Sequence, residues 1–238
     1  PSIGRAAGPQ DKYNAVTYPV KEMNDLIFIF WGTLEEGQTL PEVGWLDELD
    51  HNDFVYTTVV DHWDVDYSRV IENQLDVAHL WLVHHNTIGR GNKRVVDGPV
   101  VEWCCEWTEP NLMNIWVKNR VDDGKSIGKK PNEVVKPDRH AFLQMRIPNL
   151  WQNWITDDMR ILGVFVPIDA ERSRMYFRYY QRILKAPILR DIFLAVANLQ
   201  TRLIERQDKR VVETQLPKRS DLRIGEKLFP GDHPILEY

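Results

Sequence analysis

The pattern of apolar runs and polar breaks along the chain predicts that most of its elements are β-strands. Runs rich in β-branched and aromatic side chains are typical of strands, and Gly, Pro, Asn or Asp separates many of them. The first such run follows a strand that ends near Glu22 and a turn over Met23–Asp25, which predicts a hairpin. The predicted strands cover residues 26–31, 54–63, 99–107, 111–121, 141–148, 152–157, 160–168 and 172–182.

Two stretches change to a helical period. Residues 67–84 contain no Gly or Pro and mix apolar with polar positions as a helix does. Pro187 begins a longer helix over residues 187–214. Its expected apolar face consists of Ile188, Ile192, Leu194, Leu199, Leu203 and Ile204. This order of elements predicts an α+β fold, with a curved antiparallel sheet around the long C-terminal helix. Residues 122–139 are expected to form a lid or a disordered loop, and the tail after residue 216 to be irregular.

Composition narrows the classes of protein. The 238 residues and 28.0 kDa fit one large domain, or one domain and a fragment, and a content of 43% hydrophobic residues with 9 Trp supports a sizeable core. A net charge of −5 gives no basic surface for nucleic acid. No apolar run is long enough for a transmembrane helix. The two cysteines, Cys104 and Cys105, are adjacent and poorly placed to pair, which favours a reducing compartment and a cytoplasmic location.

The candidate chemistry lies in "RVIENQLDVAHLWLVHHNTIGRGN", residues 69–92. On one helix, Asp76 and His79 would differ in direction by about 60°, so they would share a face. His79 and His84 would lie about 140° apart and about 7.5 Å apart along the axis, so one metal can bind both only if the helix ends or distorts between them. A zinc protease is disfavoured because H-E-x-x-H is absent. A helix histidine is more often a surface or hydrogen-bonded residue, and that alternative remains open.

The whole constellation is more specific. Glu72, Asn73, Asp76, His79 and His84 fit the pattern E-N-x-x-D-x-x-H-x-x-x-x-H, which resembles the mononuclear-iron motif of the Rieske non-haem iron oxygenases that hydroxylate aromatic rings. The resemblance implies that His79 and His84 bind Fe(II) together with a downstream aspartate, as a facial triad.

A second segment supplies that aspartate. "RQDKRVVETQ" resembles the family's E-D-x-x-x-x-E-x-Q, which makes Asp208 the third ligand, with Gln207 in place of the family's glutamate and with Glu213 and Gln215 retained. The nearby acids Asp191, Glu205 and Glu213 are expected to be exposed helix charges.

The resemblance also implies roles for two neighbours of the ligands. Asp76 would connect an iron-binding histidine to the Rieske cluster of the adjacent subunit, and it would fix the orientation of the imidazole. Asn73 would line the iron pocket or form a hydrogen bond near it, and a plain helix-face amide remains the alternative. His85 is expected not to bind metal.

The expected architecture follows from the same family. Residues 36–238 would form a helix-grip (START-like) iron domain, and residues 1–35 a linker and the remnant of a Rieske domain, including the hairpin in "YPVKEMNDLIFIFWG". The cluster motifs C-x-H and C-x-x-H do not occur in the chain. A [2Fe-2S] cluster is therefore expected only in a full-length protein, and an N-terminal segment is expected to be missing.

The implied activity is O2-dependent hydroxylation or oxidative demethylation of a small aromatic or hydrophobic substrate. A reductase or ferredoxin would donate the electrons, and the protein would be a homotrimer. Without a cluster domain, the chain is expected to bind Fe(II) and to turn over poorly. The sequence leaves open whether Leu143, Met145, Ile147, Trp151 and Trp154 are pocket walls or ordinary core. The rival hypothesis is a non-catalytic helix-grip carrier of a hydrophobic ligand, and a zinc hydrolase comes third.

Overall fold

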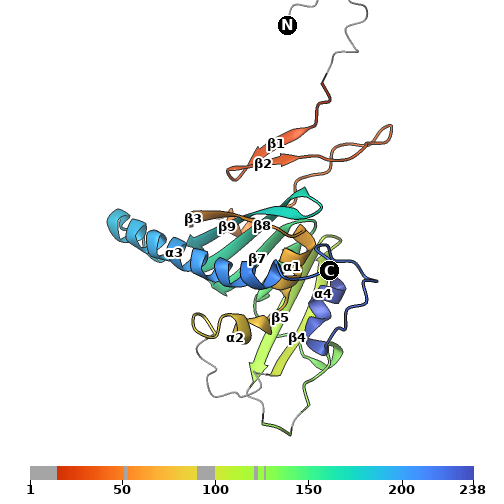
Figure 1. Ribbon diagram of the computed structural model, residues 1–238. Coiled ribbons are helices and arrows are strands. Elements are labelled where there is room, and N and C mark those ends of the chain that lie inside the picture. Colours follow the sequence, from red (N-terminus) through yellow and green to blue (C-terminus); the bar gives the residue numbers. More distant parts are fainter. Residues whose placement is uncertain (1–14, 51–52, 90–99, 121–122, 126) are drawn as a thin grey trace, which may run out of the picture. The chain divides into compact units, whose positions relative to one another are not determined.

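Antiparallel strand pairing organises residues 15–50, 53–89, 100–120, 123–125 and 127–238, which this computed structural model describes. The chain divides into two compact units, Pro1–Trp45 and Leu46–Tyr238. In the first unit, β1 (Val20–Met23) pairs with β2 (Leu26–Ile29), as Figure 1 shows. The turn residues Asn24 and Asp25 have φ values of 52° and 56°, which these two residue types tolerate better than most. The predicted hairpin is confirmed.

A seven-stranded antiparallel sheet forms the body of the second unit (Figure 1). Its order is β3-β9-β8-β7-β6-β5-β4, so β3 and β4 lie at opposite edges although they are consecutive strands. The segment that joins them must therefore cross the sheet. The strands are β3 (Val55–Trp63), β4 (Val100–Glu109), β5 (Leu112–Arg120), β6 (Leu143–Arg146), β7 (Leu150–Thr156), β8 (Met159–Asp169) and β9 (Arg172–Gln181). Every predicted strand is present, and the predicted α+β helix-grip fold is confirmed.

The crossing segment carries two short helices instead of the single helix predicted over residues 67–84. Helix α1 (Tyr67–Leu75) begins at Asp66, whose side chain accepts the backbone N–H of Ser68. It ends at Asp76, which is extended with a ψ of 101°, and α2 (His79–Val83) follows. Asp76 and His79 therefore do not share a helix face. The expected end of the helix before His84 is confirmed, because His84 is the residue that caps α2.

The hydrophobic core lies between one face of this sheet, α1 and the end of α3 (Pro187–Val212). Side chains alternate along each strand, so every second residue contributes to it. The strand residues of the core are Trp63, Trp103, Met113, Ile115, Val117, Leu143, Met145, Trp151, Phe165, Met175 and Phe177. Helix α1 adds Val70, Ile71 and Leu75, and α3 adds Val212. This packing fixes both helices that flank the candidate site.

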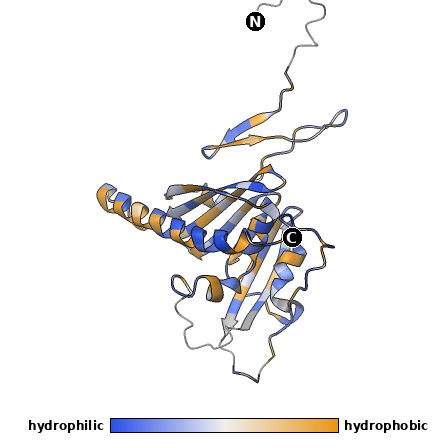
Figure 2. Ribbon diagram, in the orientation of Figure 1, coloured by the Kyte–Doolittle hydropathy of each residue, from blue (hydrophilic) through white to orange (hydrophobic). Residues whose placement is uncertain are grey.

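Helix α3 has the predicted length but presents the opposite face. Ile188 and Leu199 are 77% and 69% exposed, and Ile192 and Leu203 are exposed as well. The buried positions are Ala197, Glu205, Asp208 and Val212. At about 100° per residue, Asp208 lies about 200° round the axis from Ile188. Four of the six residues expected to form the apolar face are therefore exposed, whereas Leu194 and Ile204 are partly buried. Hydrophobic residues recur along α3, as Figure 2 shows.

The remaining helices are short. They are η2 (Asp47–Leu49), η4 (Pro131–Glu133), η5 (Pro230–Asp232) and α4 (His233–Glu237). The last two correct the expectation of an irregular tail, and η4 lies within the segment expected to be a lid or disordered. Among the helices of the described residues, none combines the length and apolar character that a membrane crossing requires.

Arg69 ties the tail to α1. Its side chain is 1% exposed and forms salt bridges with Glu72 at 2.9 Å and with Glu226 at 2.7 Å. It also donates two hydrogen bonds to the carbonyl oxygen of Pro217. Since Glu226 and Pro217 belong to the tail, this one guanidinium holds the C-terminal segment against the helix that leads into the candidate site.

Replacing Arg69 by Ala should lower the free energy of unfolding by about 3–5 kcal/mol, because the substitution leaves Glu72 and a buried carbonyl without their partner. Denaturant unfolding followed by circular dichroism measures the change. Arg172→Ala is the control, since the Arg172–Asp169 pair is exposed and its loss should change little. Equal stability losses in the two variants would contradict this role of Arg69.

Candidate metal centre

Two histidines and one aspartate from distant parts of the chain meet beside the core. The Nε2 atoms of His84 and His79 lie 2.9 Å and 3.4 Å from Oδ1 of Asp208. One donor atom from each residue lies within 4.8 Å of the others, and among the described residues this is the group that could hold a metal ion. His84 and Asp208 are buried, and His79 is largely so. The structure thus brings together the three residues that the sequence motif selects.

The turn after α2 positions His84. The backbone N–H groups of Thr87 and Gly89 both donate to the carbonyl oxygen of His84 at 2.9 Å. A Cβ atom on Gly89 would lie 2.4 Å from the carbonyl oxygen of Leu80 and 2.9 Å from that of His84. Only glycine fits so close an approach, so this residue permits the tight turn that directs the His84 ring toward Asp208.

The charges of the three residues are coupled. Burial opposes ionisation of Asp208, but the neighbouring imidazoles outweigh burial and lower the pKa of this carboxyl. Burial likewise opposes protonation of His79, but Asp208 and Asp76 raise its pKa overall. The site therefore favours the ionised form of Asp208. Oδ1 of Asp208 accepts no hydrogen bond of ordinary geometry, although two imidazole nitrogens approach it.

The spacing of the donors suits a transition metal. Two donors about 2.1 Å from one ion and at right angles to each other lie about 3 Å apart. The observed separations of 2.9 Å and 3.4 Å are close to this value. Two imidazoles and one carboxylate on one side of an ion form the donor set of mononuclear non-haem iron sites. His79, His84 and Asp208 could thus hold such an ion and leave its other positions open.

Gln207 orients the His84 imidazole, a role that the sequence comparison did not assign to it. Its Oε1 lies 2.8 Å from His84 Nδ1 and accepts the hydroxyl of Thr87, while its Nε2 donates to Asn86. This network makes Gln207 Oε1 an acceptor, so Nδ1 of His84 carries the proton and Nε2 keeps its lone pair for the site. The only signal in the sequence is its place next to Asp208, where it stands in place of the family's glutamate.

Asp76 orients His79 in a similar way. The main-chain carbonyl of Asp76 accepts from His79 Nδ1, which leaves Nε2 of His79 directed at Asp208. The Asp76 carboxylate accepts the backbone N–H groups of Ala78 and His79 and so supports the start of α2. Burial raises the pKa of Asp76, against the effects of His79 and of these two N–H groups.

Two other residues of this stretch, one in the motif and one directly after it, lie outside the triad. Asn73 is partly buried on α1, where its Oδ1 accepts from Gln74, and it does not line the cavity beside the triad. His85 is exposed, and its Nδ1 lies 3.0 Å from the carbonyl oxygen of Leu82. The imidazole of His85 is therefore not part of the group formed by His79, His84 and Asp208.

A cavity of about 110 Å³ adjoins the triad, and we call it the inner cavity. Of the proposed wall residues, Leu143 and Trp151 line it, whereas Met145 and Ile147 belong to the core or pack against it. The lining comprises Gln74, Asp76, Val77, His79, Leu80, His84, Ile88, Phe142, Leu143, Trp151, Asn153, Ile161, Phe177, Thr201, Ile204, Glu205 and Asp208. Most of these side chains are apolar, which suits a hydrophobic ligand.

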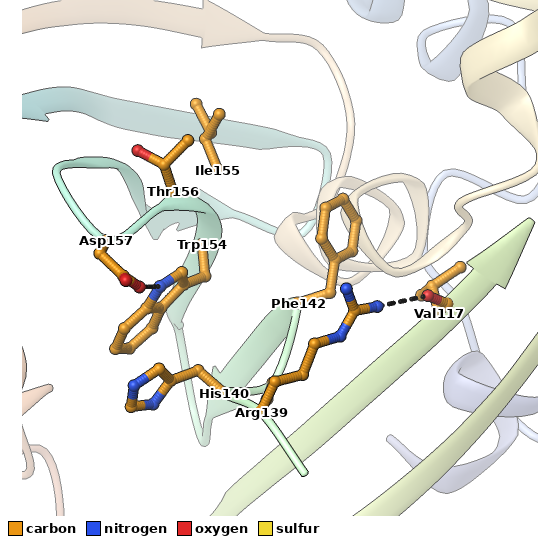
Figure 3. A pocket seen from close by; sticks show the side chains of 9 residues that line it. Val117, Arg139, His140, Phe142, Trp154, Ile155, Thr156 and Asp157 are labelled. Carbon is orange, nitrogen blue, oxygen red and sulfur yellow. Dashed lines mark hydrogen bonds between the residues drawn. The ribbon is translucent and has the colours of Figure 1, made fainter. Parts of the chain in front are cut away.

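Trp154 lines a second, more open cavity of about 380 Å³, shown in Figure 3. There its ring stacks on His140 with a centroid separation of 4.2 Å, and its Nε1 donates to Asp157. Arg139 donates across the cavity mouth to the carbonyl oxygen of Val117 (Figure 3). Phe142 belongs to the linings of both cavities, so its ring lies at their common wall.

Glu205 corrects a prediction about the acids on α3. Asp191 is exposed as expected, but Glu213 is partly buried and accepts the N–H of Asp64. Glu205 is only 4% exposed and lines the inner cavity. Burial, with the charge of Asp61 next in importance, raises its pKa to about 8. A carboxyl one turn before Asp208 faces the core because it lies on the same buried side of the helix.

The sequence of the chain matches the model of one known protein family. Residues 63–237 match the family described as the vanillate O-demethylase oxygenase C-terminal domain. No curated protein matches the chain in sequence.

Solved structures share the fold. NdmA of Pseudomonas putida CBB5, solved with caffeine, has a TM-score of 0.62 and 15% identity over 92% of this chain and 59% of NdmA. Dicamba monooxygenase bound to dicamba has a TM-score of 0.60 and 14% identity over 92% and 66% of the two chains. The terminal oxygenase of carbazole 1,9a-dioxygenase from Nocardioides aromaticivorans IC177 has a TM-score of 0.62 and 17% identity over 99% and 69%. The chain thus spans about three fifths of the length of NdmA.

The buried Glu205 makes stability depend on pH in a defined direction. Between its ordinary pKa of 4.5 and about 8, the folded chain keeps a proton that the unfolded chain releases. The free energy of unfolding should therefore fall as pH rises across this range. The variant Glu205→Gln has no proton to lose at this position, so its free energy of unfolding should not fall in this way. The difference in the free energy of unfolding between the variant and the wild type should grow by on the order of a few kcal/mol between pH 5 and pH 8. Urea unfolding at the two pH values measures it, with Asp191→Asn as the exposed control. Parallel pH dependences of wild type and Glu205→Gln would contradict the assignment.

Proposed function

Because the chain belongs to the family of the vanillate O-demethylase oxygenase C-terminal domain, the catalytic part of Rieske oxygenases, we propose that it is an iron-dependent oxygenase domain. Its reaction would be the O2-dependent hydroxylation or oxidative demethylation of a small aromatic substrate. One observation carries the proposal: His79, His84 and Asp208 converge beside a mostly apolar cavity.

The residues fit the metal that the family implies. When bound by His79, His84 and Asp208, Fe(II) would supply the open coordination positions and the redox chemistry that O2 activation requires. The protein would hold both imidazoles in one tautomer, through Gln207 Oε1 on His84 and the carbonyl of Asp76 on His79. Such outer partners orient ligands and raise their basicity. The apolar walls would exclude water from the substrate.

Electrons would come from outside this domain. Residues 1–35 are proposed to be the remnant of a Rieske-type domain and a linker, and residues 36–238 to be the iron domain. The [2Fe-2S] cluster would belong to a full-length protein. A reductase or ferredoxin would donate electrons to this cluster, and Asp76 would lie on the route of the electrons from the cluster to the iron. A homotrimer would bring the cluster of one subunit to the iron of the next.

A helix-grip carrier remains the rival from another class. The inner cavity would serve a carrier equally well, because its walls are largely apolar. A carrier has no use for a buried carboxylate facing two oriented imidazoles, since burying such charges costs free energy unless a partner offsets it. Iron binding therefore separates the two functions.

His79→Ala should reduce Fe(II) bound after anaerobic loading from about one equivalent to a small fraction, because the triad loses one of its three ligands. Iron content measured by inductively coupled plasma spectrometry after desalting gives the result. His85→Ala is the matched control, since His85 lies two residues past α2 and is exposed. Equal iron in wild type and His79→Ala would favour the carrier.

Gln207→Leu should weaken Fe(II) binding by about 10–100-fold, because His84 loses the acceptor that fixes its tautomer. Gln207→Glu keeps an acceptor oxygen at that place and should bind iron at least as well as the wild type. Competition with a metal-responsive dye measures both affinities. Unchanged affinity in the leucine variant would show that Gln207 does not position the ligand.

A further inference from the structure

Besides Oδ1 of Asp208, which faces the two histidines, three further residues that line the inner cavity each have a buried polar atom without a hydrogen-bond partner. They are Oε1 of Glu205, Oδ1 of Asn153 and Nε1 of Trp151, and no group in the described part of the chain pairs with them. Buried polar atoms in folded proteins are nearly always paired, because an unpaired one costs about 1–3 kcal/mol. Their shared position on one cavity indicates that a ligand supplies the missing partners.

Glu205 is the most costly of the three to leave unpaired. It is 4% exposed, and it lies one turn before Asp208 on the buried side of α3. A leucine at this place would pack against the apolar walls with no such cost. The acid therefore weakens the fold and gives the cavity a polar group beside the triad, which is typical of residues kept for function.

The charges around the cavity restrict what can bind. Among the described residues that line it, three are acidic, namely Asp76, Glu205 and Asp208, and none is Lys or Arg. A bound divalent metal would add positive charge, but Asp208 would be one of its ligands and would offset part of that charge. A carboxylate on the substrate would thus be buried beside acids with no Lys or Arg to pair with it, because the two histidines already face Asp208.

We propose that Glu205 is the specificity-determining residue of the inner cavity: its carboxyl group hydrogen-bonds the polar substituent of an uncharged single-ring substrate, and the cavity rejects carboxylates. The inference rests on the proposed function because it treats the ligand as the substrate of an oxygenase. The binding experiment below does not depend on that function.

The chemistry of the carboxyl suits such a substituent. With its pKa raised to about 8 by burial, the group is neutral near pH 7 and offers one donor and one acceptor. A carboxamide, or a carbonyl next to an N–H, presents the complementary pair. The volume of about 110 Å³ limits the ligand to a single ring, since a cavity of about 150 Å³ holds one benzene molecule.

The test is calorimetric titration of the full chain, free of metal, with matched neutral and anionic compounds: benzamide against benzoate, and 4-methoxybenzamide against 4-methoxybenzoate. The amides should bind at least tenfold more tightly than the acids at pH 7. Equal or tighter binding of the acids, or no binding of either amide, would overturn the proposal.

Two substitutions assign the effect to Glu205. Glu205→Met removes the polar group at similar volume and should weaken amide binding at least tenfold, whereas Glu205→Gln retains a donor and an acceptor and should stay within about threefold of wild type. Asp191→Asn, on the exposed side of the same helix, should change nothing.

Thermal unfolding excludes a merely structural role. The melting temperature of Glu205→Met should equal or exceed that of the wild type, since an unpaired polar group has been replaced by an apolar one. A lower melting temperature, or failure to fold, would show that Glu205 serves the fold and would overturn the proposal. The iron content of His79→Ala is measured independently of amide binding. Unchanged iron content in that variant would contradict the proposed function, whereas absence of the amide preference would contradict only the role of Glu205.

Discussion

A carboxylate buried between two imidazoles is the interaction on which this structure depends. Asp208 is 4% exposed, and its oxygen lies 2.9 Å and 3.4 Å from the histidine nitrogens. Removing a carboxylate from water is expensive unless positive charge and hydrogen bonds compensate. The break between α1 and α2, the turn closed by Gly89 and the packing of the end of α3 all place compensating groups around it. Local features that look unrelated in the sequence thus serve one electrostatic requirement.

A ligand in the inner cavity must also compensate a buried polar group, because the carboxyl of Glu205 has an oxygen without a partner there. Part of the wall of this cavity comes from strand residues that also form the core, namely Leu143, Trp151 and Phe177, so the cavity adjoins the core directly. Apolar walls strengthen every electrostatic interaction inside them, because the local dielectric constant is low. A single unpaired carboxyl there has far more influence on what binds than the same group would have on the surface.

Much of this could be predicted from the sequence. Runs rich in β-branched and aromatic residues identified every strand of the sheet, because such side chains pack well on a half-buried pleated surface. The iron motif selected His79 and His84, and the segment "RQDKRVVETQ" selected Asp208. Periodicity could not orient α3, since its apolar stripe from Ile188 to Leu203 is stronger than the buried face that carries Glu205 and Asp208. Nor could it place the helix break at Asp76, where side-chain bonds to the next backbone N–H groups outweigh helix propensity. The role of Gln207 depends on a contact 123 residues away in the chain, which no local pattern encodes.

The separation of the ligands along the chain has a consequence for biosynthesis. Asp208 follows His79 by 129 residues, and six strands of the sheet lie between them. During synthesis, the two histidines and the strands β4 to β9 leave the ribosome before the carboxylate of Asp208 does. A metal ion that used all three residues would therefore find its complete donor set only once nearly the whole domain is made, so its binding would follow the docking of α3.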